Sequence, residues 1–163
     1  MRIREATADD LPALRDIERD AGRMFDAIGM TAVADDEPFS IGELERYRRA
    51  GRAWVAIDDD DEPVGYVIAE LLDGNAHVEQ VSVRPANTRR GLGRALVERV
   101  VAEARALGYR TLKLDTLPSM KAAQALYASL GFVDTAAYNA NPVAGVRFMA
   151  LDLAQPARLA PTS

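Results

Sequence analysis

Apolar residues recur every three or four positions in several stretches of the chain, which is the spacing of an amphipathic helix. These stretches begin near Leu11, Ile41, Gly91 and Ser119. Ser40 is a favourable N-cap before the second stretch, and glycines follow the last three as helix stops, at Gly51, Gly108 and Gly131. The residues from Met24 to Phe39 contain breakers and are predicted to be irregular. The pattern therefore predicts about four helices.

Alternating or continuous apolar runs between these helices indicate short β-strands. The predicted strands cover residues 2–6, 53–57, 64–69, 75–83, 111–115, 132–138 and 146–153. An acidic run from Asp58 to Glu62 separates two of them and is predicted to be a solvated hairpin tip. Strands that pair locally, with helices between them, predict an α/β (α+β) fold with a mixed sheet of six or seven strands. Residues 1–153 are predicted to form one domain, followed by a tail at 154–163.

Composition excludes several classes of function. The 163 residues carry a net charge of −5, which argues against nucleic acid as the main partner. The absence of cysteine excludes disulfides, thiolate metal sites and a cysteine nucleophile, and it suits a reducing cytoplasm. With His77 as the single histidine, no metal site is expected. No apolar run approaches the ~20 residues of a membrane span, so a cytoplasmic protein is predicted.

The segment from Arg84 to Val97 departs from this acidic background. It contains four arginines and no acid, and it reads as a strand end, a basic turn with Gly91 and Gly93, and the start of a helix. A helix N-terminus directs backbone N–H groups and the positive end of its dipole at one spot, which is how many proteins hold phosphate. The segment therefore predicts an anionic ligand.

Two familiar phosphate motifs do not fit this turn. The P-loop pattern G-x-x-x-x-G-K-[ST] is absent from the chain. The dinucleotide pattern G-x-G-x-x-G begins at Gly91 and Gly93 but meets Leu96 where its third glycine belongs. A generic nucleotide-binding domain is therefore disfavoured.

The turn Thr88–Gly93 resembles the acyl-CoA-binding motif of the GCN5-related N-acetyltransferases (GNAT), which reads [Arg/Gln]-x-x-Gly-x-[Gly/Ala]. Downstream, Ala123–Phe132 is similar to the family pattern A-x-x-L-Y-x-x-x-G-F. Thr88 stands where the family usually has Arg or Gln, and Met120 stands where many members have Asn. In the order of its elements the resemblance covers residues 2–153.

The resemblance implies the GNAT fold, with a sheet splayed where CoA binds, and acetyl-CoA as co-substrate without a metal. The basic turn would hold the pyrophosphate, and the strand before it would pair with the pantetheine arm. The residues assigned to the cofactor are Val81, Ser82, Val83, Thr88, Arg89, Arg90, Gly91, Leu92, Gly93 and Arg94.

Two residues receive catalytic roles through the resemblance. Tyr127 would donate a proton to the departing thiolate, and Glu79 would act as general base toward the amine. Each has a plainer interpretation. Tyr127 can be a core aromatic on an apolar helix face, and Glu79 can be a solvated strand position.

The predicted function is acetyl transfer from acetyl-CoA to a primary amine by direct attack, with a small-molecule amine favoured. A protein N-terminus or lysine is the alternative acceptor, and an inactive acetyl-CoA-binding regulatory or interaction module is the alternative function. The resemblance places the acceptor between Met24–Phe39 and Tyr138–Gly145. The sequence does not fix the oligomeric state, a homodimer included.

Overall fold

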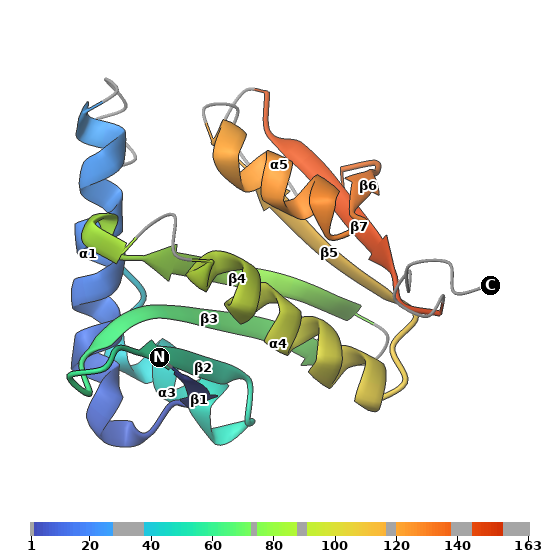
Figure 1. The fold of residues 1–163 in the computed structure, drawn as a ribbon. Coiled ribbons are helices and arrows are strands. Elements are labelled where there is room, and N and C mark those ends of the chain that lie inside the picture. Colours follow the sequence, from blue (N-terminus) through green and yellow to red (C-terminus); the bar gives the residue numbers. More distant parts are fainter. Residues whose placement is uncertain are drawn as a thin grey trace. The chain divides into compact units, whose positions relative to one another are not determined.

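The computed structural model describes residues 2–27, 38–72, 75–87, 91–116, 120–137 and 145–154, with the side chains of 23–27, 72 and 75 excepted. The helices are α1 (Leu11–Ala27), α3 (Ile41–Arg49), α4 (Leu92–Ala106) and α5 (Lys121–Ser129), with 3-10 turns at Ala8–Asp10 and Pro85–Asn87. The strands are β1 (Arg2–Glu5), β2 (Ala53–Ile57), β3 (Pro63–Leu72), β4 (Asn75–Val83), β5 (Thr111–Thr116), β6 (Val133–Asp134) and β7 (Arg147–Asp152) (Figure 1).

The strands follow the order β1-β2-β3-β4-β5-β7-β6. The pairs β1–β2, β2–β3, β5–β7 and β6–β7 are antiparallel, whereas β4 and β5 pair in parallel with His77 opposite Lys113. The chain divides into two compact units. The first holds residues 1–70 and 79–100, and the second holds 71–78 and 101–163.

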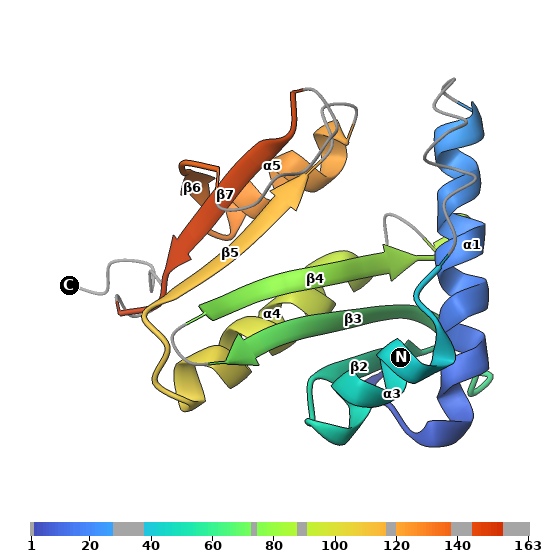
Figure 2. The same ribbon diagram turned by 180° about the vertical axis from the view of Figure 1, so that it is seen from behind.

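The strand β3 separates two helical layers in the first unit. Tyr66 and Ile68 belong to a buried cluster with residues of α1, α3 and β2. Gly65 lies on the opposite face, against Leu96 of α4. Figures 1 and 2 show α4 crossing β3 and β4 on the near face in one view and on the far face in the other. This alternation explains the continuous apolar run of β3, because both of its faces are covered.

Gly65 leaves little room for any side chain. A Cβ at this position would lie 3.2 Å from the backbone oxygen of Ser82 and 3.3 Å from Cδ1 of Leu96. We expect Gly65→Ala to lower the free energy of unfolding by about 1–3 kcal/mol, because the strand backbone cannot move aside freely. Urea denaturation measures this loss. Gly42→Ala is the matched control, since its Cβ would meet nothing closer than 3.9 Å. Equal stability of Gly65→Ala and wild type would contradict the prediction.

The second unit is built around β5 and β7. Leu112 pairs with Leu151 and Leu114 with Met149, and all four side chains are buried. In Figures 1 and 2 the helix α5 covers one face of these two strands. The sheet and α5 thus enclose a second apolar core.

Three predicted elements differ from the structure by more than two residues at one end. Helix α1 continues to Ala27, past the predicted irregular start at Met24, because Met24 keeps the helical spacing from Ile17. The strand β3 covers Pro63–Leu72 and is longer than predicted. The predicted strand 132–138 is reduced to the two residues of β6, which pair with β7 at the edge of the sheet. The predicted tail from residue 155 onward lies outside the described residues.

In the described parts of the chain, each helix is too short or too polar to cross a bilayer.

Candidate cofactor and catalytic site

The start of α4 has the geometry of an anion site. Gly91 has φ +75°, a conformation that residues with a Cβ rarely adopt, and its carbonyl accepts the first helical bond from the Ala95 N–H at 3.0 Å. The first turn of a helix leaves its N–H groups without acceptors inside the helix. Leu92 is buried and anchors this turn, while Gly93 is half-buried. The helix dipole and these N–H groups therefore favour a bound anion.

Carboxylates accompany two of the four arginines of the segment. Arg84 pairs with Asp20 of α1 at 3.3 Å, and its Nε donates to the Pro63 carbonyl at 3.3 Å. Arg94 lies 3.7 Å from Glu98 on the same helix, with both side chains about half exposed. Arg84 therefore ties the end of β4 to α1 and β3.

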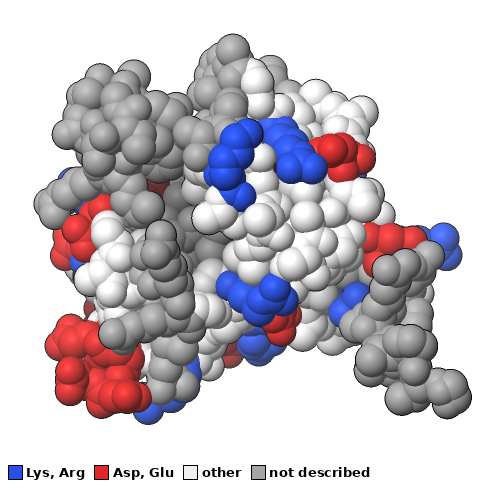
Figure 3. Space-filling view, turned by 45° about the horizontal axis from the view of Figure 1, so that its top comes forward, with Lys and Arg blue, Asp and Glu red and all other residues white. Residues whose placement is uncertain are grey.

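The predicted cofactor residues Thr88, Arg89 and Arg90 lie outside the described residues. On the face shown in Figure 3, basic side chains stand in small groups near acidic ones and form no continuous basic surface among the described residues. In the described part of the turn, the groups that favour an anion are therefore the backbone N–H groups at the N-terminus of α4.

The end of β4 carries the three strand residues assigned to the pantetheine arm. Ser82 is 5% exposed, and its Oγ accepts a hydrogen bond from Nε2 of Gln80 at 2.8 Å. The Ser82 hydroxyl also bonds to the Tyr66 hydroxyl on β3. Because this hydroxyl is engaged within the first unit, Ser82 would meet a ligand through its backbone, as the assignment of Val81 and Val83 also requires.

Glu79 belongs to a polar cluster on the α3 side of the first unit. The pKa of the Tyr47 hydroxyl on α3 is raised by burial first, and then by the negative charges of Glu79 and Glu70. The Tyr47 hydroxyl also bonds to the Glu70 carboxylate. Glu79 is half-buried, so its surroundings differ from those of a solvated strand residue.

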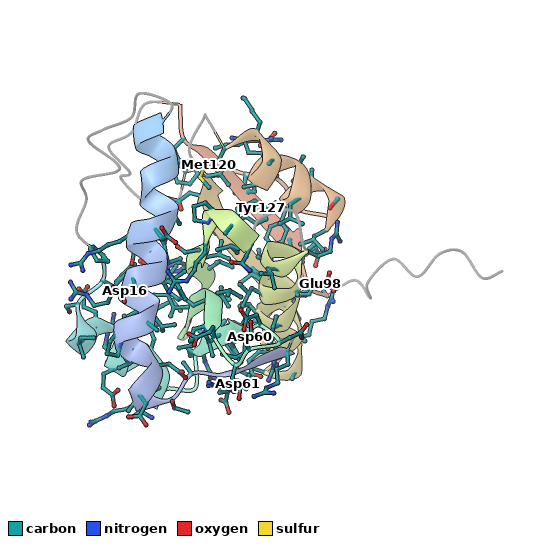
Figure 4. All side chains as sticks on the ribbon, turned by 60° about the vertical axis from the view of Figure 1, so that its left-hand side comes forward. Asp16, Asp60, Asp61, Glu98, Met120 and Tyr127 are labelled. Atoms are coloured by element: carbon teal, nitrogen blue, oxygen red, sulfur yellow. The ribbon has the colours of Figure 1, made fainter. Side chains whose placement is uncertain are left out.

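Tyr127 is 5% exposed on α5, and its ring lies 5.9 Å from that of Phe132 (Figure 4). Burial raises the pKa of its hydroxyl to about 12, and the charge of Asp115 on β5 contributes to the rise. The ring packs as a core aromatic would, and the hydroxyl stays protonated as a proton donor must. Both interpretations of this residue are therefore compatible with its position.

Asp115 is the residue that the sequence patterns missed. It belongs to the second unit together with Tyr127, and its charge acts on the Tyr127 hydroxyl. The signal was present, because Asp115 is an acid in a strand whose alternate residues Leu112 and Leu114 are buried. However, a single acidic residue in a short strand gives the same sequence pattern as an acid that simply faces solvent.

Met120 precedes α5 as its N-cap and makes no side-chain capping bond. Its carbonyl accepts from the Gln124 N–H at 3.0 Å, so the first helical bond is in place. A thioether cannot donate a hydrogen bond, so the contact that Asn would offer in many family members has no equivalent at this side chain.

Metal binding has no support in the described residues, where no group of three or more His, Cys, Asp or Glu side chains could hold an ion.

The family model for the acetyltransferase (GNAT) family matches residues 11–132, which is most of the chain. The protein therefore belongs to the GNAT family. The mixed seven-stranded sheet agrees with this fold, as predicted.

Several known proteins are similar to this chain in sequence or in structure. The [ribosomal protein bS18]-alanine N-acetyltransferase of Salmonella typhimurium is 40% identical over 73 residues, covering 45% of this chain and 49% of its own. The crystal structure of the ribosomal-protein-S18-alanine N-acetyltransferase from Escherichia coli has a TM-score of 0.73 at 26% identity, over 96% of both chains. The yncA structure from Salmonella typhimurium, which contains acetyl-CoA, has a TM-score of 0.72 at 25% identity over 93% of both chains. The sequence matches span between 49% and 63% of the length of the first three curated relatives.

Proposed function

We propose that this protein transfers an acetyl group from acetyl-CoA to a primary amine by direct attack. The observation that carries the proposal is the turn at Gly91. This glycine has a positive φ and directly precedes α4, at the end of the basic turn that follows β4. The acetyl-CoA bound in the yncA structure supports the choice of donor.

In this proposal the cofactor is held at two places. The N–H groups at the start of α4, together with residues 88–94, bind the pyrophosphate. The backbone of Val81–Val83 pairs with the pantetheine amides, which would otherwise be buried without partners. Backbone N–H groups of the same strand polarise the thioester carbonyl.

The chemistry then needs three proton transfers. An alkyl amine with a pKa near 10 is protonated at neutral pH, and removing its proton costs about 4 kcal/mol. A carboxylate accepts this proton, the amine nitrogen attacks the thioester carbon, and the carbon–sulfur bond breaks. Tyr127 donates its proton to the departing thiolate, whose conjugate acid has a pKa of about 8.5. The nitrogen then gives its second proton to the tyrosinate, which restores Tyr127, and the carboxylate releases its proton to solvent. The products are an N-acetylated amine, free CoA thiol and one proton.

We assign the base to Glu79, which is half-buried and interacts with the Tyr47 hydroxyl. Asp115 is the competing carboxylate because its charge acts on Tyr127. The variants Glu79→Gln and Asp115→Asn distinguish the two residues in an assay of CoA release. The residue whose substitution lowers kcat more is the base.

The acceptor is the less determined substrate. The acidic composition favours a cationic small-molecule amine, because net negative charge attracts cations. The second candidate is the N-terminal amine of a protein, which the names of two relatives favour, since both act on the alanine of a ribosomal protein.

The test is release of free CoA thiol by the full chain with acetyl-CoA and a panel of amines. The panel contains polyamines, amino acids, amino sugars, a lysine peptide and a peptide that begins with alanine. The protein has no cysteine, so a thiol reagent reports CoA alone. We expect turnover with at least one amine, and the favoured acceptor class is the one with the highest kcat/KM. Tight acetyl-CoA binding without thiol release across the panel would contradict the proposal and favour an inactive binding module.

A further inference from the structure

One carboxylate oxygen of Glu18, on α1, accepts hydrogen bonds from two other parts of the first unit. The Tyr66 hydroxyl donates to its Oε1 across 2.9 Å, and the Phe39 N–H donates to the same atom across 3.1 Å. Burial raises the pKa of Glu18, which shows that the carboxylate is partly withdrawn from water. Losing either bond would leave a desolvated group poorly satisfied, so Glu18 restrains both donors.

The Tyr66 branch leads to β4. The Tyr66 hydroxyl bonds to the Ser82 hydroxyl, whose oxygen accepts from Nε2 of Gln80 at 2.8 Å. Tyr66 is fully buried and Ser82 nearly so. Since Gln80 donates to Ser82 and Tyr66 donates to Glu18, the bonds run head to tail toward the carboxylate. Bonds aligned in this way polarise and strengthen one another.

The Phe39 branch leads to α3. Arg15 of α1 donates from Nε to the Phe39 carbonyl at 3.0 Å, so α1 holds both backbone groups of Phe39. The Phe39 ring packs edge-on against Tyr47, with ring centroids 6.4 Å apart. The Tyr47 hydroxyl in turn interacts with Glu79.

Both branches therefore end on β4, at Ser82 and at Glu79. We propose that Glu18 is a positioning residue for acyl transfer, which fixes the segment Glu79–Ser82 through Tyr66 on one side and Phe39 on the other. This inference rests on the proposed function, because the segment carries the proposed base and adjoins the backbone assigned to the thioester.

Glu18 can affect catalysis because different contacts hold the main chain and the side chains of β4. Hydrogen bonds between strands hold its main chain, but they leave the side-chain rotamers of Glu79 and Ser82 unspecified. The Tyr66 branch restrains the Ser82 side chain by hydrogen bonds, and the Phe39 branch holds Tyr47, whose hydroxyl lies in the electric field of Glu79. Catalysis is sensitive to such restraint, because a misplacement of about 1 Å can cost a factor of 10² in rate.

The test compares Glu18→Gln with Asp16→Asn in the full-length protein. Glu18→Gln keeps the size of the side chain but replaces a charged acceptor by a weaker neutral one. Asp16→Asn removes the same charge from an exposed position of α1 (Figure 4). With the best amine of the panel, we expect kcat of Glu18→Gln to fall about tenfold. Its Kd for acetyl-CoA, measured by calorimetry, should stay within about twofold, because the cofactor is held mainly at its pyrophosphate. Asp16→Asn should retain both values.

Tyr66→Phe is the second variant, since it removes one branch and keeps the ring in the core. We expect it to lower kcat by about threefold, again without a change in Kd beyond about twofold. Circular dichroism and thermal unfolding establish that each variant is folded at the assay temperature. If Glu18→Gln does not fold, Tyr66→Phe decides the question with the same two measurements.

The outcomes separate this inference from the proposed function. If the wild type is active and Glu18→Gln matches Asp16→Asn in kcat, the inference is wrong and the proposed function stands. If a folded Glu18→Gln loses acetyl-CoA binding to the same extent as kcat, the role of Glu18 is structural and the inference is wrong. If the wild type releases no CoA with any amine, the proposed function fails and the inference fails with it.

Discussion

Tyr127→Phe is expected to lower kcat about 100-fold while leaving the Kd for acetyl-CoA within about twofold. The hydroxyl is the group that would protonate the departing thiolate, and phenylalanine cannot supply a proton. The substitution keeps the ring contact with Phe132, so the free energy of unfolding should change by no more than about 1 kcal/mol. Steady-state thiol release and calorimetry measure the two quantities.

The pH dependence of the wild type gives an independent check on the same assignment. A tyrosine with an ordinary pKa of about 10 would begin to lose its proton near pH 9. Because the pKa of Tyr127 is raised to about 12, the donor form persists, and kcat should not decline through this group up to pH 10.5.

For the Tyr127→Phe substitution, Tyr109→Phe is the matched control and should keep the wild-type kcat. Full activity of Tyr127→Phe would remove the residue from the mechanism.

Gly91→Ala is expected to raise the Kd for acetyl-CoA about tenfold. Holding a residue with a Cβ at φ +75° costs about 1–2 kcal/mol, and the turn can relieve that cost by shifting the first N–H groups of α4. A shift of these groups weakens their bonds to the pyrophosphate, and 1.4 kcal/mol corresponds to a factor of ten in Kd. Calorimetric titration with acetyl-CoA measures the change.

Gly108→Ala is the control for Gly91→Ala. Gly108 follows the other end of α4 with φ +84°, and a Cβ would meet nothing within 4 Å at either glycine. Both variants should therefore lose a similar free energy of unfolding, of about 1–2 kcal/mol. Only Gly91→Ala should affect the cofactor. If the two variants bind acetyl-CoA equally well, the pyrophosphate is held elsewhere.

Local patterns predicted most of the elements because the forces that define them act over a few residues. The helix Ile41–Arg49 begins where the sequence predicts, since Ser40 caps it and the Ser40 Oγ accepts from the Glu43 N–H. The last hairpin was predicted less well. The length of β6 depends on its pairing with β7, in which the Thr135 N–H still donates to the Phe148 carbonyl at 2.9 Å just after the two paired positions. An edge strand has a partner on one side only, so its own residues do not define where it stops.

Charge was the property that the sequence described least well. The four arginines of the segment from Arg84 to Val97 indicated a concentration of positive charge. In the structure Arg84 pairs with Asp20, which lies 64 residues away and was part of a predicted amphipathic helix. Charge counted along the chain cannot include partners that only folding brings near, and an ion pair cancels much of the local field.

The sequence alone determined the family and predicted the donor. Helical and strand periodicity, Gly91 with Gly93, and the pattern around Tyr127 are local, and the family match over residues 11–132 agrees with them. Only the tertiary structure decided which groups surround the assigned residues. It placed the charge of Asp115 near Tyr127, and it joined Glu18 to Tyr66 across 48 positions of sequence. Hydrogen bonds between such distant side chains follow from how helices pack on strands, and no periodic pattern in the sequence records them.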